Sequence, residues 1–416
     1  MARKMKDSGI EWIGEIPEGW EVLAHKYIMH KEKSICEHYS GEDVISLTLN
    51  GVVKRDLENP SGKMPTTFDG YQFVDPNDLL LCLFDIDVTP RCVGLVKDYG
   101  VTSPAYSRFK IHSGFCNAYY NYLLRFIDDE KVFVHLSKNL RSSLTESDFS
   151  AIKTIVPPKA EQQRIADYLD NRTFEIDTLL SKARSSIEEY KKLKQAVITQ
   201  AVTKGVRGER KMKDSGVEWI GTYPSNWKII KIKWLLHERK DRSVTGLEEP
   251  LSMSQKKGLI PTKDMDSIPN MASSFIGAKL VYNGDLVFNK LKAHLGVFSV
   301  SKYNGLVSPD YAVYYSTGPA NLNFLELLFK TPQYINEFKK KSSGVGAGLT
   351  RLYTGDLYSI YCALPPLVEQ EEIADYLDIK CTEIDRLIAK KEQLVKELES
   401  YKKSLIYEVV TGKREV

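Results

Sequence analysis

KMKDSGIEWIGEIPEGW, from Lys4 to Trp20, returns as KMKDSGVEWIGTYPSNW from Lys211 to Trp227, with 12 of 17 positions identical. A second block, EQQRIADYLDNRTFEID from Glu161 to Asp177, returns as EQEEIADYLDIKCTEID from Glu369 to Asp385. The two offsets, 207 and 208 residues, are almost equal, and a Pro-Pro pair precedes each copy of the second block. This period is too long for a solenoid repeat, so one whole domain with its connector is used twice.

The bulk composition is that of an ordinary globular protein. The 416 residues leave room for two to four domains, and 42% hydrophobic with 27% charged residues argues against wholesale disorder. No apolar run reaches membrane-spanning length and the first residues carry no hydrophobic signal segment, so we expect a cytoplasmic protein. The six cysteines form no CxxC pair, which favours reduced, separately packed thiols.

Each Pro-Pro pair is followed by a long helical pattern. Apolar positions recur at alternating spacings of four and three, which predicts a coiled-coil seam of nearly four heptads in each copy. Residues 170–173 read as a break, with Thr173 capping a longer helix that ends near Gly205. The predicted seam positions are Ile176, Leu180, Ala183, Ile187, Tyr190, Lys194, Val197 and Ala201, and then Ile384, Ile388, Lys391, Val395, Leu398, Lys402, Leu405 and Val409.

Two lysines occupy the same seam position, where an apolar residue is expected. Lys194 and Lys402 are related by the 208-residue offset. Either their aliphatic stems cover the edge of the seam while the ammonium groups reach water, or their charges set the register of the helix pair.

The order of the repeats predicts how the chain closes. The second copy of the opening motif follows directly from a helix, 161–203, whereas the first copy begins the chain. No helix precedes the first copy of the motif, and the C-terminal helix, 369–411, is the candidate to take the position that such a helix would have. We therefore expect a circular arrangement with adjacent termini, in which two antiparallel coiled-coil helices separate two pseudo-two-fold-related lobes.

The segments between the repeated blocks, 29–155 and 237–363, differ in sequence but share a skeleton. Short strands rich in Val, Ile, Tyr and Phe alternate with helical stretches, which predicts α+β lobes. Their charges differ: 15 Lys/Arg against 11 Asp/Glu gives +4 in 237–363, whereas 14 against 17 gives −3 in 29–155. The expected domains are 1–155, which opens with the repeated motif 4–28, then 156–210, 211–363 and 364–416.

The duplicated pair of motifs is similar to a known family. EWIGxxPxxW opening a lobe, and PPxxEQxxIADYLD opening a long helix, both repeated around two unlike domains, resemble the specificity subunits of type I restriction–modification systems. The resemblance covers nearly the whole chain. It implies that 29–155 and 237–363 are target recognition domains, each reading one half of a split DNA sequence. The repeated helices would fix the spacer between the halves and dock two methyltransferase subunits, which separate motor-nuclease subunits join.

The predicted helix length agrees with this spacer role. The 28 residues from Ile176 to Thr203 span roughly 40 Å at the rise of an α-helix. One turn of B-DNA is about 34–36 Å, a separation that suits two half-site contacts on one face of the duplex.

The motifs of catalysis are missing from the sequence. The double prolines stand in Val156-Pro-Pro-Lys159 and Leu364-Pro-Pro-Leu367, not in the N-P-P-aromatic motif of adenine methyltransferases, and no GxxxxGK[ST] phosphate loop occurs. The histidines lack metal-ligand spacing, and Asp85 with Asp87 has no third carboxylate nearby for Mg²⁺. We therefore expect a non-catalytic subunit, with adenosylmethionine, ATP and Mg²⁺ bound by partner subunits.

Base readout in the major groove uses Arg or Lys for guanine and Asn or Gln for adenine. Such side chains cluster at predicted loops of both lobes, whereas the repeated tryptophans, Tyr106 and Tyr311 read as structural. The candidates for DNA contact are Asn50, Lys54, Arg55, Lys63, Arg91 and Arg108 in the first lobe, and Gln255, Lys256, Lys257, Asn289, Lys290, Lys292 and His294 in the second.

The long helices also carry apolar residues away from the predicted seam. A helix that is apolar on two faces is usually covered on both, which predicts helices from other chains packed against these positions. The partner-binding candidates are Leu179, Leu193, Ile198, Leu387, Leu394, Tyr401 and Ile406.

A different class of function fits part of this pattern. A non-catalytic bivalent scaffold that binds two protein or glycan partners would also explain the duplication, the long helices and the weak net charge of +3. Its binding would be insensitive to salt, whereas DNA binding is strongly salt-dependent.

Overall fold

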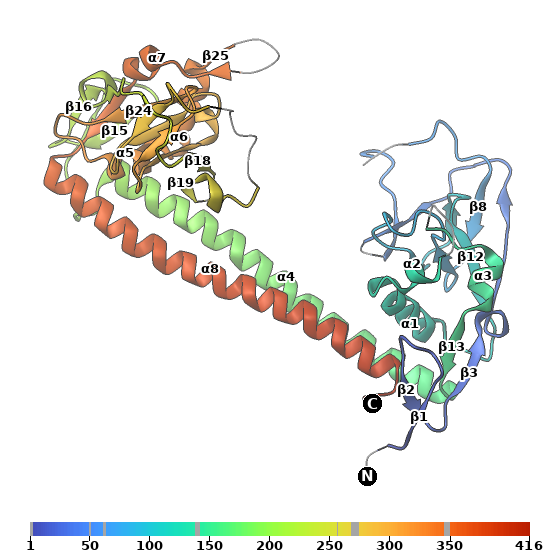
Figure 1. The fold of residues 1–416 in the computed structure, drawn as a ribbon. Coiled ribbons are helices and arrows are strands. Elements are labelled where there is room, and N and C mark those ends of the chain that lie inside the picture. Colours follow the sequence, from blue (N-terminus) through green and yellow to red (C-terminus); the bar gives the residue numbers. More distant parts are fainter. Residues whose placement is uncertain are drawn as a thin grey trace. The chain divides into compact units, whose positions relative to one another are not determined.

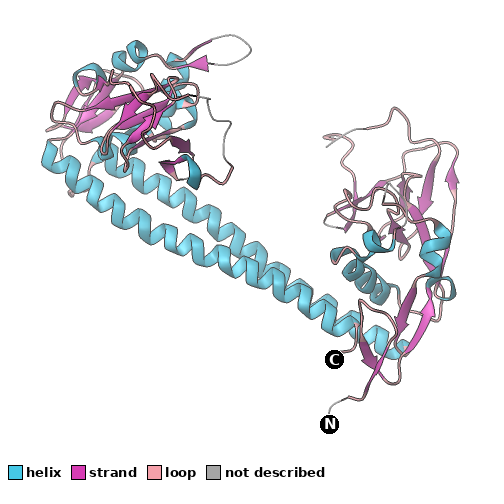
Figure 2. Cartoon of the chain, in the orientation of Figure 1, coloured by secondary structure: helices cyan, strands magenta, loops and turns pink. Residues whose placement is uncertain are grey.

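The computed structural model describes residues 3–49, 51–60, 64–137, 142–255, 257–267, 274–344 and 350–416 (Figure 1). The chain divides into two compact units. Unit 1 comprises Met1–Arg184 with Gln393–Val416, and unit 2 comprises Ser185–Glu392. Each unit mixes helices and strands, as predicted (Figure 2). Within the described ranges, none of the helices is both long enough and apolar enough to cross a bilayer.

The lobe of unit 1 is built on two sheets and a buried helix. One sheet has the order β10-β9-β12-β4 and the other β5-β8-β11-β6-β7. Helix α1 buries Tyr119, Leu123 and Ile127 in the main core. The elements are β1 (Met5–Asp7), β2 (Glu15–Pro17), β3 (Glu21–Ala24), β4 (Met29–Lys31), β5 (Ile35–Cys36), β6 (Val44–Thr48), β7 (Gly51–Lys54), β8 (Tyr71–Val74), β9 (Leu79–Leu81), β10 (Val93–Leu95), β11 (Gly100–Thr102), β12 (Ser107–Ile111), α1 (Asn117–Asp129), α2 (Val132–Leu136), α3 (Glu146–Ala151) and β13 (Lys153–Val156).

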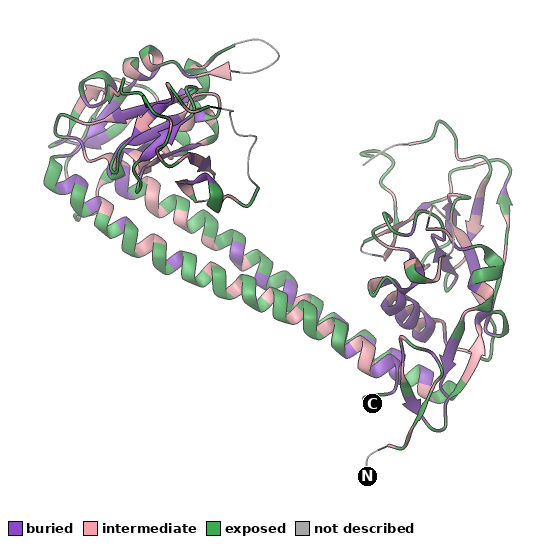
Figure 3. Ribbon diagram, viewed as in Figure 1, coloured by how far each residue is buried: buried purple, intermediate pink, exposed green. Residues whose placement is uncertain are grey.

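The lobe of unit 2 has a comparable central sheet, with the order β17-β24-β21-β22. Helix α5 covers it with Phe324, Leu325 and Leu328, which are buried. Strands of this lobe are largely coloured as buried in Figure 3. The elements are β14 (Met212–Asp214), β15 (Thr222–Pro224), β16 (Lys228–Lys231), β17 (His237–Glu238), β18 (Leu251–Ser254), β19 (Gly258–Pro261), β20 (Lys279–Val281), β21 (Leu286–Asn289), β22 (Phe298–Val300), β23 (Gly305–Val307), β24 (Tyr311–Tyr315), α5 (Leu322–Phe329), α6 (Pro332–Lys341), β25 (Ser343–Gly344), β26 (Thr350–Arg351), α7 (Thr354–Ser359) and β27 (Tyr361–Leu364).

Two long helices, α4 (Lys159–Lys204) and α8 (Leu367–Val410), contribute a segment to each unit. In unit 1, Lys402 pairs with Asp177 and Glu399 with Arg184, so the two segments run antiparallel. In unit 2, the pairing of Lys194 with Asp385 gives the equivalent contact. All sixteen predicted seam positions are buried or half-buried, which confirms the heptad register. The predicted break at 170–173 is wrong: α4 is continuous there, and the Thr173 hydroxyl donates to the Leu169 carbonyl oxygen at 2.6 Å inside the helix.

The C-terminal residues of unit 1 lie against its N-terminal motif. Gly412 has φ +71°, and a Cβ there would stand 2.6 Å from the Pro17 ring, so this close approach requires glycine. Lys413 Nζ donates to the Ile13 carbonyl oxygen at 2.9 Å, and the Tyr119 hydroxyl donates to that of Val410 at 2.9 Å. The predicted adjacency of the termini is confirmed.

The seam lysines form ion pairs and do not only cover the edge of the seam. Lys194 Nζ lies 2.7 and 2.6 Å from the two carboxylate oxygens of Asp385, and Lys402 Nζ lies 2.6 and 2.7 Å from those of Asp177. The two pairs are repeat equivalents, because the 208-residue offset relates Lys194 to Lys402 and Asp177 to Asp385. Because a one-turn slip of the antiparallel segments would separate both, these charges favour a single register.

Double-mutant cycles on the two pairs should give matching coupling energies. We expect Lys194→Ala with Asp385→Ala, and Lys402→Ala with Asp177→Ala, each to show about 0.5 kcal/mol of coupling, because the carboxylates are largely exposed to solvent. Denaturant unfolding at low and high salt would measure it. Lys191→Ala with Glu188→Ala, a pair within one helix, is the control that should not respond to the helix–helix register. Zero coupling in both seam cycles would contradict the role in register.

Candidate nucleic-acid interface

Each lobe is held to its helix by a buried glutamine. Gln162 accepts the Cys116 backbone N–H at 2.9 Å and donates to the Pro157 carbonyl oxygen at 2.8 Å. Gln370, at the equivalent repeat position, accepts the Asn321 N–H at 2.8 Å and donates to the Pro365 carbonyl oxygen at 2.9 Å. Both side chains are almost completely buried. Since the lobe contributes a main-chain N–H, this attachment does not depend on which side chain the lobe carries there.

The repeated opening motif has a structural role, as predicted. Trp20 and Trp227 are each 1% exposed. Trp20 Nε1 donates to Glu161 at 3.0 Å, and Arg3 pairs with the same carboxylate at 2.7 Å. In unit 2, the equivalent Glu369 pairs with Arg210 and accepts a hydrogen bond from Asn226. Trp12 and Trp219 are half-buried and pack against the same two cores.

The first-lobe candidates for DNA contact differ in their exposure. Lys54 is exposed on β7, with Nζ 2.7 Å from Asp43, and Arg55 next to it is half-buried. Asn50 and Lys63 lie outside the described residues. Arg91 is largely buried, with Nη1 2.9 Å from Asp129. Of this set, Lys54, the last residue of β7, and Arg55, directly after it, lie next to each other.

Arg108 does not fit its predicted role. The side chain is 2% exposed, and its guanidinium donates to Asp78 at 2.5 Å, to Asp75 at 2.6 Å and to the Phe73 carbonyl oxygen at 2.9 Å. Burial raises the pKa of Asp78, and Arg108 opposes that rise. An arginine whose three nitrogens are all bonded inside the lobe cannot reach a base edge, and its removal would leave the buried Asp78 carboxylate without its cation.

The second-lobe candidates fall into two groups. Gln255 and Lys257 are exposed at the turn between β18 and β19, and Lys256 between them lies outside the described residues. These two line a cavity of about 280 Å³ with Phe298 and Ser299 of β22. Lys257 Nζ lies 2.6 Å from Asp266.

The other group follows strand β21. Asn289 ends the strand and lines a separate cavity of about 450 Å³, and its side-chain oxygen accepts the Leu291 N–H at 3.1 Å. Lys290 and His294 are half-buried, whereas Lys292 is exposed. Asn289, Lys290, Lys292 and His294 thus lie at the end of β21 and in its connection to β22, where Ala293–Leu295 form a 3-10 helix, and their contact with DNA stays a prediction.

Tyr106 and Tyr311 pack in the lobes, as predicted. Tyr106 is half-buried against two core clusters of the first lobe, and Tyr311 against one of the second. Burial raises the pKa of both phenols.

Five of the seven predicted partner-binding residues lie on the open faces of the helices. Leu179, Leu193, Leu387, Leu394 and Tyr401 are 40–51% exposed, whereas Ile198 and Ile406 are half-buried against the cores of their own units. Sequence reasoning missed Phe174 and Ile379, which are 74% and 59% exposed on the same helices. Reading residues 170–173 as a break hid the helical face to which Phe174 belongs.

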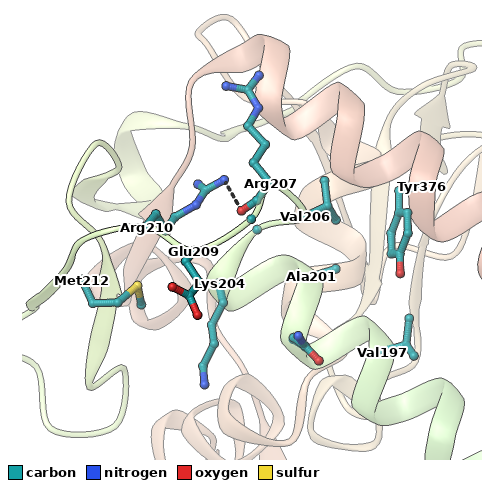
Figure 4. A pocket seen from close by; sticks show the side chains of 12 residues that line it. Val197, Ala201, Lys204, Val206, Arg207, Glu209, Arg210, Met212 and Tyr376 are labelled. Atoms are coloured by element: carbon teal, nitrogen blue, oxygen red, sulfur yellow. Dashed lines mark hydrogen bonds between the residues drawn. The ribbon is translucent and has the colours of Figure 1, made fainter.

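A cavity of about 560 Å³ lies where α4 of unit 2 leads into the connector before β14 (Figure 4). Its lining includes Lys204, Arg207, Arg210 and Tyr376. Arg207 forms a bidentate ion pair with Glu372 of α8, with N–O distances of 2.6 and 2.7 Å. Arg210 pairs with Glu369 of the same helix. These arginines therefore fasten the connector to the helix pair.

Three relatives of the chain are all specificity subunits of type I restriction enzymes. No protein-family model matches the chain. It is 26% identical to a putative type I restriction enzyme MjaX specificity subunit of Methanocaldococcus jannaschii, over 71% of this chain and 67% of the relative. It is 22% identical to the MjaVIII specificity subunit of the same organism, over 64% and 63%, and 22% identical to the EcoDI specificity subunit of Escherichia coli, over 55% of each.

The solved structures show the same fold. A chain from a structural study of complex assembly and conformational transition of the type I R-M system aligns with a TM-score of 0.69 at 14% identity, over 96% of this chain and 99% of that one. The HsdS subunit of Thermoanaerobacter tengcongensis aligns with a TM-score of 0.54 at 15% identity, over 96% and 98%.

Proposed function

Because the chain belongs to the specificity subunits of type I restriction enzymes, we propose that each of its two lobes reads one half of a bipartite DNA sequence. The lobes correspond to 29–155 and 237–363, within the proposed domains 1–155 and 211–363. The helices of 156–210 and 364–416 fix the spacer between the two half-sites. Methylation and ATP-dependent cleavage then belong to partner subunits, which would bind adenosylmethionine, ATP and Mg²⁺.

One observation carries this proposal. Gln162 and Gln370 attach two lobes of different sequence through the same pair of hydrogen bonds on a duplicated frame. A frame that holds any lobe through its main chain leaves the lobe surface free to vary. That arrangement suits a protein whose two readers recognise different sequences on one duplex.

The exposed apolar faces of α4 and α8 support the docking of partner helices. We propose that two methyltransferase subunits bind there, one to each unit, and that motor-nuclease subunits join through them. Leu179 and Leu387 are repeat equivalents, 51% and 41% exposed. Equivalent apolar positions in both units favour two copies of one partner over two unrelated partners.

Adenine methylation across a genome tests the proposed function. The chain would be expressed with its methyltransferase in a host that lacks such a system. We expect methylation at one bipartite motif with a fixed gap near one helical turn. A folded chain that forms no methyltransferase complex, methylates nothing and binds its partners without salt dependence would support the bivalent scaffold instead.

Charge placed on the helix faces should disrupt partner docking without unfolding the chain. We expect Leu179→Lys with Leu387→Lys to weaken binding of the methyltransferase subunit at least tenfold, because a buried ammonium would face an apolar partner surface. Pull-down and calorimetric titration would measure the affinity, and circular dichroism the fold. Gln195→Lys, at an exposed polar position of α4, is the matched control. Equal binding by both variants would place the partner elsewhere.

A further inference from the structure

The second lobe contains two ion pairs close to the loop that follows β21. Lys279 Nζ lies 3.1 Å from Glu238 and donates to the Tyr311 carbonyl oxygen at 2.7 Å. Arg351 Nη2 lies 2.7 Å from Asp310. Each carboxylate of this cluster is therefore already matched by one cation.

Lys290 is a third cation in the same place. The Leu352 N–H donates to the Lys290 carbonyl oxygen at 3.0 Å, which ties the loop to the end of β26 and puts Lys290 beside Arg351. Lys290 is half-buried, and its ammonium makes no hydrogen bond or close ion pair within the part of the chain that the structure describes, although the charges of Glu238 and Asp310 act on it from a distance. Burial, and then the charge of Lys279, lower the pKa of Lys290. The cluster thus holds three cations against two carboxylates.

Arg351 adds an unused donor to this cluster, because its Nε is buried and has no acceptor among the described residues. The cavity of about 450 Å³ lies next to the cluster, since Asn289 and Asp310 line it, but Lys290 and Arg351 are not among its lining residues. A half-buried lysine without a partner costs folding free energy, and sites of this kind are typical of ligand binding rather than of folding.

Two described candidate arginines of the first lobe, Arg91 and Arg108, each have a carboxylate partner, although Arg91 Nε and Nη1, like Arg351 Nε, have no hydrogen-bond acceptor among the described residues. Arg91 pairs with Asp129, and Arg108 is enclosed by Asp75 and Asp78. The loop after β9, which corresponds to the loop after β21, carries Asp85 and Asp87. The net charges of the variable segments, −3 for 29–155 and +4 for 237–363, likewise place more positive charge in the second lobe.

We propose that Lys290 and Arg351 form an anion site that takes one phosphate of the DNA backbone, and that the second lobe thereby carries the larger share of the salt-dependent affinity. The proposal rests on the DNA-reading function and adds a location to it. Phosphate contacts position a protein on the duplex, and base contacts read the sequence. The second lobe would then anchor the subunit electrostatically, while the first contributes mainly through base contacts.

Two measurements with the full chain test the site, and the matched control is an exposed lysine. Lys290→Ala is compared with wild type, with Lys290→Arg, and with Lys228→Ala on β16, which removes the same charge from an exposed position of unit 2 outside 237–363. The first measurement is thermal stabilisation of the chain alone by inorganic phosphate. The second is the affinity of the complex with its methyltransferase for a synthetic DNA duplex over a series of salt concentrations.

We expect Lys290→Ala to lose most of the phosphate stabilisation, to bind the duplex about three- to tenfold more weakly, and to lower the salt slope by about one. Lys290→Arg should restore both, and Lys228→Ala should match wild type. Because the Lys290 ammonium makes no hydrogen bond or close ion pair with the residues that the structure describes, its loss should not lower the melting temperature.

Other outcomes overturn the proposal in distinguishable ways. Phosphate stabilisation that depends on Lys290, with duplex affinity that does not, would make this a site for free phosphate. Wild-type affinity and slope in Lys290→Ala, or an equal loss in Lys228→Ala, would leave the DNA-reading function standing without this site. A wild-type complex that binds no duplex would remove the DNA-reading function itself.

Discussion

Exchange of residues 237–363 for the equivalent lobe of another specificity subunit will change one half of the methylated sequence and leave the other half and the spacer unchanged. The fold explains why such an exchange is tolerated. Strand β16 enters the lobe and β27 leaves it, and the two pair antiparallel from Lys228 with Leu364 to Lys231 with Tyr361. The chain thus enters and leaves the lobe at one place.

The buried glutamine completes this argument. Gln370 binds the main-chain N–H of residue 321 and not its side chain, so a foreign lobe can form the same bond. Genome-wide mapping of methylated adenines would measure the outcome. The reciprocal exchange of 29–155, entered by β3 and left by β13, should change the other half. A changed spacer, or changes in both halves after one exchange, would show that the lobes do not read independently.

The opening motifs and the long helices, which form the duplicated frame of this molecule, could be predicted because the sequence contains two copies of each. The same periodicity in two copies identified the seam, and every predicted seam position is covered in the structure. The error at Thr173 arose because a polar run with threonine is typical of a helix start. Inside α4 the Thr173 hydroxyl instead bonds back to the preceding turn at Leu169, and burial of Leu169 and Ile176 on either side keeps the helix continuous.

The candidate interface was harder to predict, because residue type does not reveal how a charge is used. Arg108 and Lys290 were equal candidates by sequence, yet one is enclosed by two carboxylates and the other has no partner among the described residues. The carboxylates that decide this, Asp75 and Asp78, come from a different strand connection and are distant in sequence. Only the pairing of β12 with β9 brings Arg108 to them.

Between pH 7 and pH 5, the free energy of unfolding of unit 1 should fall by about 2 kcal/mol because of His25. A His25→Ile variant should not show this part of the fall. His25 is 1% exposed, and burial lowers its pKa to about 4, although a hydrogen bond with the Phe149 carbonyl oxygen at 3.1 Å opposes this. The unfolded chain takes up the proton near pH 6.5, whereas the folded chain does so near pH 4. Stability from this group is therefore complete above pH 6.5 and is lost as the pH falls toward 4.

The repeat supplies the control for this prediction. Ile232 is the equivalent of His25, is fully buried, and makes the same backbone bond, to Ile360 where His25 bonds to Ile152. Isoleucine therefore fits this position of the frame, and the Phe149 carbonyl oxygen keeps the Ile152 N–H as a donor in the variant. Denaturant unfolding at pH 7 and pH 5 gives the difference. Since carboxylates titrate equally in both proteins, an unchanged pH dependence in His25→Ile would mean that His25 becomes protonated in the folded state without cost.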